Sequence, residues 1–317
     1  MAVSSRFPRR WFYTRDNTRI SVMLKDPLLQ PVLITMADLS PVDSLGRCGV
    51  NQSGTFTNVA DQRQSLQHVY RGISTNNSAS ISNGSRAMDY AITGWNADGS
   101  FDGVDTTAFS VLGILDAYFQ IWMALVQDGR NAAAFSQYST QFKTSMDWFL
   151  NDSPALFPAE WAAIGVTTNG VSSLAMTLRL AAILLKEPSY VATSNTYVTQ
   201  IGAQQNAAGW FNENGGFDSH YQGINMWRQA VLLNHVDQSH PMDKIAKLGF
   251  TWWKSRMIYP PSSPAGKIDG TGNSRTPVLN FGHYIENIIA MAFWARISRD
   301  RGLHDQAYRT YRYALTL

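Results

Sequence analysis

Apolar residues recur every three or four positions through most of the chain beyond residue 60, and this spacing is typical of amphipathic helices. The clearest case is 104–127, where a stripe of large apolar side chains recurs at helical spacing. Asp105, Thr106 and Thr107 at its start supply N-capping groups, and Gly129 follows as a stop signal. The residues of the stripe are Phe109, Leu112, Leu115, Phe119, Trp122 and Leu125.

The same pattern predicts further helices, several of which end at proline or glycine. Residues 1–60 differ, because the apolar and partly β-branched runs 19–25 and 31–39 favour short strands in a hairpin or an extended arm. We therefore expect an irregular or β-containing N-terminal arm, 1–60, packed on a helical domain, 61–317. The expected helices are 61–73, 104–127, 131–150, 171–187, 194–207, 224–236, 241–257, 283–299 and 305–317.

An internal repeat organises these helices. The loop from Gly94-Trp95 to Phe101-Asp102 resembles the loop from Gly209-Trp210 to Phe217-Asp218, and each precedes a helix. Polar loops also precede the helices near 171 and 283. One hairpin cannot bury its apolar face alone, so neighbouring hairpins must stack, which places these loops at one end of the stack. The alternative is a plain solenoid or bundle in which the loops are only turns.

Composition and charge exclude several function classes. Charged residues make up 15% of the chain, below the usual level of about 25%. A net charge of +3, with a basic cluster only near the start, does not indicate nucleic-acid binding. The single cysteine, Cys48, excludes an intrachain disulfide, and no Cys/His spacing suggests zinc. We expect no secretory signal and no membrane span. The clustered residues are Arg6, Arg9, Arg10, Arg15 and Arg19.

Candidate chemistry is densest in 209–228. Tyr221, Asn225 and Arg228 are spaced i, i+4 and i+7, so they share one helix face. A phenol, an amide and a guanidinium together suit proton abstraction next to a carboxylate. The amide and guanidinium would neutralise the carboxylate, and Tyr221 or His220 would transfer the proton. This chemistry requires no metal or cofactor. The alternative is that these are ordinary packing, capping or ion-paired helix residues.

Other residues before the predicted helices extend this candidate site. Asn169 precedes one helix and His283-Tyr284 begin another, with Glu286 three residues further on; capping and packing are the alternative roles. Aromatic and polar loop residues are candidates for binding sugar rings, because the apolar faces of sugars pack on aromatic side chains. The candidate substrate-binding residues are Trp95, Trp210, Glu213, Asn225, Tyr284, Asp102 and Asp218. Trp227 is a further candidate for stacking.

The segments NADGSFDG (96–103) and GGFDSHYQG (215–223) resemble loops of the α/α-toroid polysaccharide lyases, in which helical hairpins close into an incomplete ring. The resemblance implies an all-α toroid that cleaves an acidic, uronic-acid-containing polysaccharide by β-elimination. It implies Tyr221 as catalytic base and acid, and His220 or His283 as a second proton-transfer group. Asn169 and Arg228 would neutralise the carboxylate. The chain departs from many of these lyases, because it has no room for a β-sandwich after the ring.

Two other functions are compatible with the same scaffold. An α/α-ring glycoside hydrolase would need a pair of carboxylic acids, which Asp98, Asp102, Glu213 and Asp218 could supply. A helical-repeat protein could also bind carbohydrate without cleaving it. A polysaccharide substrate would be extracellular or periplasmic, whereas the sequence does not indicate an oligomeric state.

Overall fold

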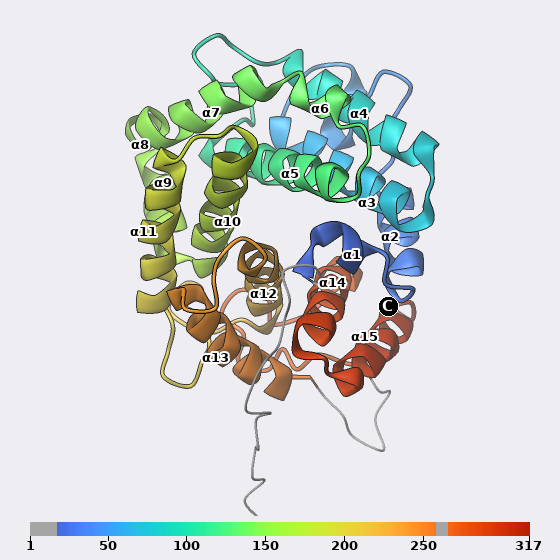
Figure 1. Cartoon of the computed structure of the whole chain (residues 1–317), viewed down its shortest axis with the longest axis vertical. Helices are drawn as coiled ribbons and strands as arrows, with labels where there is room; N and C mark the ends of the chain where they lie inside the picture. The colour runs from blue at the N-terminus through green and yellow to red at the C-terminus, as the bar shows by residue number, and fades with distance from the viewer. Residues whose placement is uncertain (1–17, 258–265) are drawn as a thin grey trace, which may run out of the picture.

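A computed structural model describes residues 18–257 and 266–317, which form an all-α toroid of helical hairpins (Figure 1). Within each hairpin the first helix belongs to the inner layer and the second to the outer layer. The predicted fold class is therefore confirmed. The hairpins are α3 (Ser65–Thr75) with α4 (Ser78–Ile92), α5 (Ala108–Gln127) with α7 (Ser139–Asn151), α10 (Thr168–Leu184) with α11 (Ser189–Ala203), α12 (Ser219–Leu233) with α13 (Pro241–Ser255), and α14 (Phe281–Ser298) with α15 (Arg301–Ala314).

The ring is held together by contacts between successive inner helices. In order, α3 packs on α5, α5 on α10, α10 on α12, and α12 on α14. The helix α2 (Leu29–Asp38) contacts both α14 and α3 and so closes the circle. The short segments α6 (Ala133–Ser136), α8 (Ser153–Leu156) and α9 (Pro158–Val166) connect α5, α7 and α10. The short 3-10 helices η2 (Gly49–Ser53) and η3 (Val59–Gln64) precede α3.

Inner helices are apolar nearly all round because they are covered on every side. In α5, every residue from Ile114 to Leu125 is buried. This helix is also long and apolar enough to cross a membrane, and within the described part of the chain no other helix is. Of its most apolar window, 83% is buried inside the ring.

The strands expected near the N-terminus are helices instead. Residues 19–25 contain α1 (Ile20–Leu24), and 31–39 lie largely in α2. A short apolar run is compatible with either structure, and burial against α3, α5 and α14 favours helix here. Arg6, Arg9, Arg10 and Arg15 fall outside the described residues, and the boundary at residue 60 stays a prediction.

The repeat is real, but its predicted alignment is wrong. Gly99 corresponds to Gly209, not to Gly215, because NADGSF (96–101) and NAAGWF (206–211) form the same bend. Phe101 pairs with Trp95 in one bend, and Phe211 pairs with Gln205 in the other. The predicted alignment matched the Gly-Trp and Phe-Asp pairs of the two segments. The structural equivalence instead follows the glycine that each bend requires.

Three such bends, at Gly46, Gly99 and Gly209, are seated on the backbone of the outer helix that follows, and Gly266 makes an equivalent contact. All four glycines have positive φ. A Cβ on Gly209 would lie 2.4 Å from the carbonyl oxygen of Leu248 in α13, and the other three have equivalent contacts on α4, α7 and α15. These contacts therefore fix the heights of α3, α5, α12 and α14 relative to their outer partners.

We expect Gly209→Ala to destabilise the protein by about 2 kcal/mol, because it adds a backbone clash to the strain of a positive φ. Gly215→Ala is the matched control, since Gly215 also has a positive φ (84°) but nothing lies within 4 Å of its added Cβ. The control should cost about 1 kcal/mol. Urea unfolding of both variants measures the difference. Equal losses would show that Gly209 matters only for its φ.

Candidate functional site

A cavity of about 420 Å³ opens at the N-terminal ends of the inner helices. Its walls come from α2, η3, α3, α5, α10, α12 and α14. The predicted clustering of chemistry at one end of the hairpins therefore coincides with a real cavity. The polar residues that line it are Arg63, Gln67, Asp116, Asn169, Ser173, His220, Tyr221, Arg228, His283 and Glu286.

Tyr221 is presented by the first turn of α12. Asp218 caps this helix by accepting hydrogen bonds from the backbone N–H groups of His220 and Tyr221, at 3.0 and 3.1 Å. The same carboxylate accepts bonds from the backbone N–H groups of Arg275 and Thr276. Asp218 is 1% exposed, and its carboxylate anchors the loop that precedes α12; its contact with substrate stays a prediction.

His220 is fixed in one tautomer by Asn287. The indole N–H of Trp253 donates to Oδ1 of Asn287, and Nδ2 of Asn287 donates to the carbonyl of His283. Nδ2 of Asn287 therefore also donates to Nδ1 of His220, at 3.2 Å. The His220 proton is left on Nε2, which lies 3.4 Å from Oε2 of Glu286. Burial, together with the nearby His283, lowers the pKa of His220 to about 3, so its ring is neutral at physiological pH.

His283 is fixed in the same way. Its Nδ1 accepts a hydrogen bond from the backbone N–H of Asn280 in a reciprocal N-terminal cap of α14. The proton therefore lies on Nε2, and burial lowers the pKa of this imidazole. The ring centroids of His220 and His283 lie 4.2 Å apart. Both imidazoles are thus placed to donate a hydrogen bond, and neither has a free lone pair.

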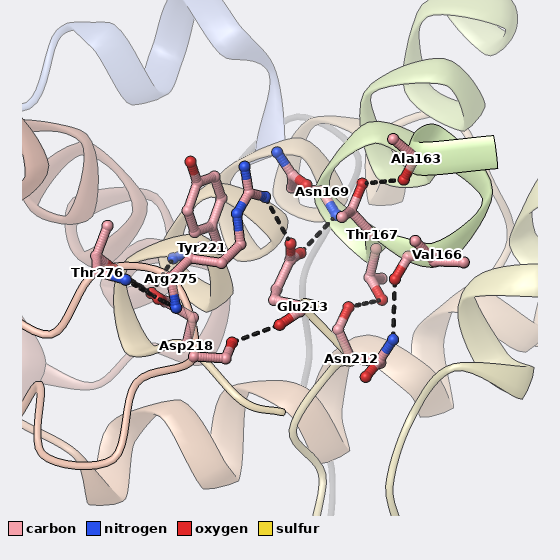
Figure 2. Close-up of polar contacts among 12 residues, drawn as sticks. Ala163, Val166, Thr167, Asn169, Asn212, Glu213, Asp218, Tyr221, Arg275 and Thr276 are labelled. Atoms are coloured by element: carbon pink, nitrogen blue, oxygen red, sulfur yellow. Dashed lines mark hydrogen bonds and ion pairs between the residues drawn. The ribbon is translucent and has the colours of Figure 1, made fainter. Parts of the chain in front are cut away.

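Asn169 is tied to the loop of α12 through a buried carboxylate, as Figure 2 shows. Glu213 accepts a hydrogen bond from the Asn169 backbone N–H at 2.8 Å and pairs with Arg275 at 3.1 Å. Asn225 Nδ2 contacts the same carboxylate at 3.4 Å. The side-chain Oδ1 of Asn169 is buried without a partner among the described residues, whereas Asn169 lines the cavity and its Nδ2 donates no hydrogen bond within the described ranges, so this donor remains available to a ligand.

Arg275 lies directly over the ring of Tyr221, with its guanidinium carbon 3.9 Å from the ring centroid (Figure 2). Burial raises the pKa of the Tyr221 phenol, and the charge of Arg275 opposes that effect. The Tyr221 hydroxyl forms no hydrogen bond within the part of the chain that the structure describes. The phenol is therefore held in place by its ring, while its oxygen is free to act.

A second charged group lies deeper in the cavity. Arg228 Nε contacts Asp116 Oδ2 at 3.3 Å, and its guanidinium covers the ring of Trp227 at 4.3 Å. Trp227 is 4% exposed, so it is not a stacking surface for sugar. Glu286 lines the cavity, and 38% of its side chain is exposed there. Its pKa is raised by burial, against the opposing charges of Arg228 and Arg63.

Several predicted substrate-binding residues lie away from this cavity. The Trp95 indole donates to Ser145 on the outer helix α7, and Trp210 packs edge-on against Phe217. Asp102 accepts a hydrogen bond from Asn96 within its own bend. Tyr284 is 2% exposed, and its hydroxyl accepts from the backbone N–H of Ile268. The bends place Trp95, Trp210 and Asp102 towards the outer layer, and Tyr284 packs in the core within α14. Their contact with substrate stays a prediction.

Glu213 and Asn225 occupy an intermediate position. Both are fully buried behind Tyr221, so they contact the cavity-lining residues rather than the cavity itself. The carboxylate pair of the hydrolase alternative is not assembled. Asp98 and Asp102 are exposed on their bend, whereas Glu213 and Asp218 are enclosed.

Three charged residues of this region were not predicted from the sequence: Arg275, Arg63 and Asp116. Arg275 lies in a long loop with no helical pattern, and only folding brings it to Tyr221. Asp116 is the one charged residue of the apolar helix α5. Because a buried charge needs a partner, the sequence did indicate that Asp116 would have a polar or charged neighbour. In residues 18–257 and 266–317, no group of three or more His, Cys, Asp or Glu side chains is arranged to hold a metal.

Sequence comparison finds no matching family model and no matching curated protein. Structural comparison does find a match, to a solved structure described as "Polysaccharide Lyase BACCELL_00875". The match covers 96% of this chain and 90% of the other, with a TM-score of 0.54 and 10% sequence identity. At this identity the likeness concerns the fold, so the chain shares the overall fold of a polysaccharide lyase.

Proposed function

We propose that this protein is a polysaccharide lyase that cleaves an acidic, uronic-acid-containing polysaccharide by β-elimination. The observation that supports it best is the arrangement of Tyr221, stacked under Arg275, near Asn169 in one polar cavity. A free phenol oxygen, an available amide and two neutral imidazole N–H donors are the groups that this reaction uses.

In this mechanism the sugar carboxylate binds at the side chain of Asn169, which lines the cavity from the first turn of α10. Hydrogen bonds to the carboxylate stabilise the negative charge that develops when the C5 proton leaves. His220 and His283 donate from Nε2 and can add to this stabilisation. The two histidines thus act in our proposal as hydrogen-bond donors rather than as bases.

Tyr221 carries the proton in both directions. As a phenolate, stabilised by the Arg275 charge over its ring, it takes the proton from C5. The electron pair of that C–H bond forms the C4–C5 double bond, and the C4–O bond to the leaving sugar breaks. Tyr221 then returns the proton to the leaving oxygen. Atoms and charges balance with no other reactant.

The test is to incubate the protein with a panel of anionic polysaccharides and follow two products. The lyase forms an unsaturated uronide that absorbs in the ultraviolet, in step with new reducing ends. New reducing ends without this absorbance would instead indicate a hydrolase. Binding without any cleavage would indicate a carbohydrate-binding protein.

A further inference from the structure

Arg228 lies too deep to share a carboxylate with Tyr221 and Asn169. It is the tenth residue of α12, whereas Tyr221 is the third residue of that helix. Seven residues of helix correspond to a rise of about 10 Å. Its partner Asp116 stands at a similar depth, as the ninth residue of α5. Arg228 therefore belongs to the floor of the cavity, and the reacting groups belong to its rim.

The guanidinium of Arg228 is only partly used by the protein. Nε makes one contact of 3.3 Å with Asp116, and Nη1 is buried without a partner among the described residues. An arginine side chain offers five N–H donors in a planar fork. The side chain is only 15% exposed, and the stacked Trp227 ring fixes its plane. Such a fork is preorganised to bind a planar anion.

Arg63 adds a second positive charge to the same cavity. Within 18–257 and 266–317, its side chain makes no hydrogen bond or ion pair. The Arg63 side chain packs on α5 at Gly113. A Cβ added to Gly113 would lie 3.8 Å from Cδ and from Nη1 of Arg63. Arg63 and Arg228 both act electrostatically on Glu286, which places the three groups in one region.

The cavity is closed at the opposite end of the ring. Thr18 accepts a hydrogen bond from Asn234, which follows the C-terminus of α12, and Lys25 pairs with Asp128 at the C-terminus of α5. Between these two ties, α1 lies against α3, α5 and α14 (Figure 1). A ligand that enters at Tyr221 therefore meets the arginines at the closed end of the cavity.

We propose that Arg228 and Arg63 form a second anion subsite, which binds an acidic group on the sugar next to the one that is cleaved. The proposal rests on the proposed function and adds a substrate class to it. The substrate would carry acidic groups on adjacent sugars, as carboxylates in a chain made only of uronates, or as sulfates on the intervening sugars.

The test uses the full chain with Tyr221→Phe, to prevent turnover, and calorimetry with saturated oligosaccharides of equal length. One ligand has a uronate at every position, a second alternates uronate with a neutral sugar, and a third alternates uronate with a sulfated sugar. Arg63→Gln is expected to weaken the all-uronate ligand about tenfold and the neutral-alternating ligand hardly at all. Arg228→Lys should also weaken binding of the all-uronate ligand, because lysine lacks the planar fork.

The controls separate this effect from folding and from bulk charge. Arg312→Gln removes the same charge from an exposed position on the outer helix α15 and should leave binding unchanged. Arg228→Lys keeps a cation beside Asp116, so the buried carboxylate is not left unpaired. Thermal melting of each variant checks that it is folded.

The outcomes distinguish the two proposals. If the sulfated ligand depends on Arg63 as strongly as the all-uronate ligand does, the subsite accepts sulfate; if it does not, the subsite is specific for carboxylate. Equal weakening of all ligands, or of none, overturns the subsite, as does failure of every ligand to bind. Selective binding without cleavage by the unmodified protein would keep the subsite and refute the lyase. If Arg63→Gln still cleaves the polysaccharide, with a lower kcat but an unchanged affinity, the lyase is kept and the subsite is refuted.

Discussion

Tyr221→Phe is expected to lower the rate of polysaccharide cleavage by a factor of about 10² to 10⁴, the usual contribution of general acid–base catalysis. The variant removes only the phenol oxygen. The ring stays beneath Arg275, and the hydroxyl has no hydrogen bond to lose among the described residues. Substrate affinity and thermal stability should therefore remain close to those of the parent protein. Ultraviolet product formation under single-turnover conditions measures the rate.

Tyr308→Phe is the matched control, because Tyr308 is an exposed tyrosine on the outer helix α15. It should leave the rate unchanged. Full activity of Tyr221→Phe would refute the proton-transfer role proposed for Tyr221. Loss of activity together with a lower melting temperature would instead assign Tyr221 a structural role.

The helical ring could be predicted from sequence because its inner helices are dominated by burial. In α5 and α14, apolar residues recur on all faces, and no alternative structure of that length would hide them. By contrast, α4 was missed because Ser, Asn and Gly dominate its sequence. Its Gly84 packs closely on the carbonyl of Ser65 and on Val69 in α3, so a tight helix contact requires the small residue.

The candidate site could be predicted only in part, for a similar reason. Tyr221, His220, Asn169 and His283 stand at the starts of inner helices, and the repeat places all such starts at one end of the ring. Arg275 could not be found in this way. Its position depends on bonds from the backbone N–H groups of Arg275 and Thr276 to Asp218, which join segments 57 and 58 residues apart. No local pattern encodes such a contact.

The tautomers of the two histidines were also beyond sequence reasoning. A histidine next to a tyrosine suggests proton transfer, and His220 was assigned that role on the resemblance. Its chemistry is decided by Asn287, which lies 67 residues away and is itself oriented by Trp253. For His283 the alternative from sequence was packing between loop and helix. The structure shows that its Nδ1 caps α14, while a role in proton transfer stays a prediction.

Glu213 should make the protein less stable as the pH rises from about 5 to 8. Burial raises the pKa of this carboxyl from 4.5 to about 7, although the Asn169 N–H and Arg275 favour its charged form. The unfolded chain loses this proton near pH 4.5 and the folded chain near pH 7. The stabilising contribution of the bound proton is therefore complete below pH 4.5 and is lost as the pH rises through 7.

The size of the effect follows from the shift. The difference between 4.5 and about 7 corresponds to about 3 kcal/mol of unfolding free energy. Glu213→Gln keeps the shape of the side chain and removes the titration. Relative to the parent, this variant should therefore gain up to about 3 kcal/mol of stability between pH 5 and pH 8.

Urea unfolding of both proteins at several pH values measures this difference. Glu187→Gln, on the outer layer beside Lys143, controls for the loss of one negative charge. If the parent instead gains stability relative to Glu213→Gln as the pH rises, the ion pair with Arg275 outweighs burial, and the Glu213 pKa lies below its usual value. That result would make the Glu213–Arg275 pair a permanent charge pair, so the net charge of the pair beside Tyr221 would not vary with pH near neutrality.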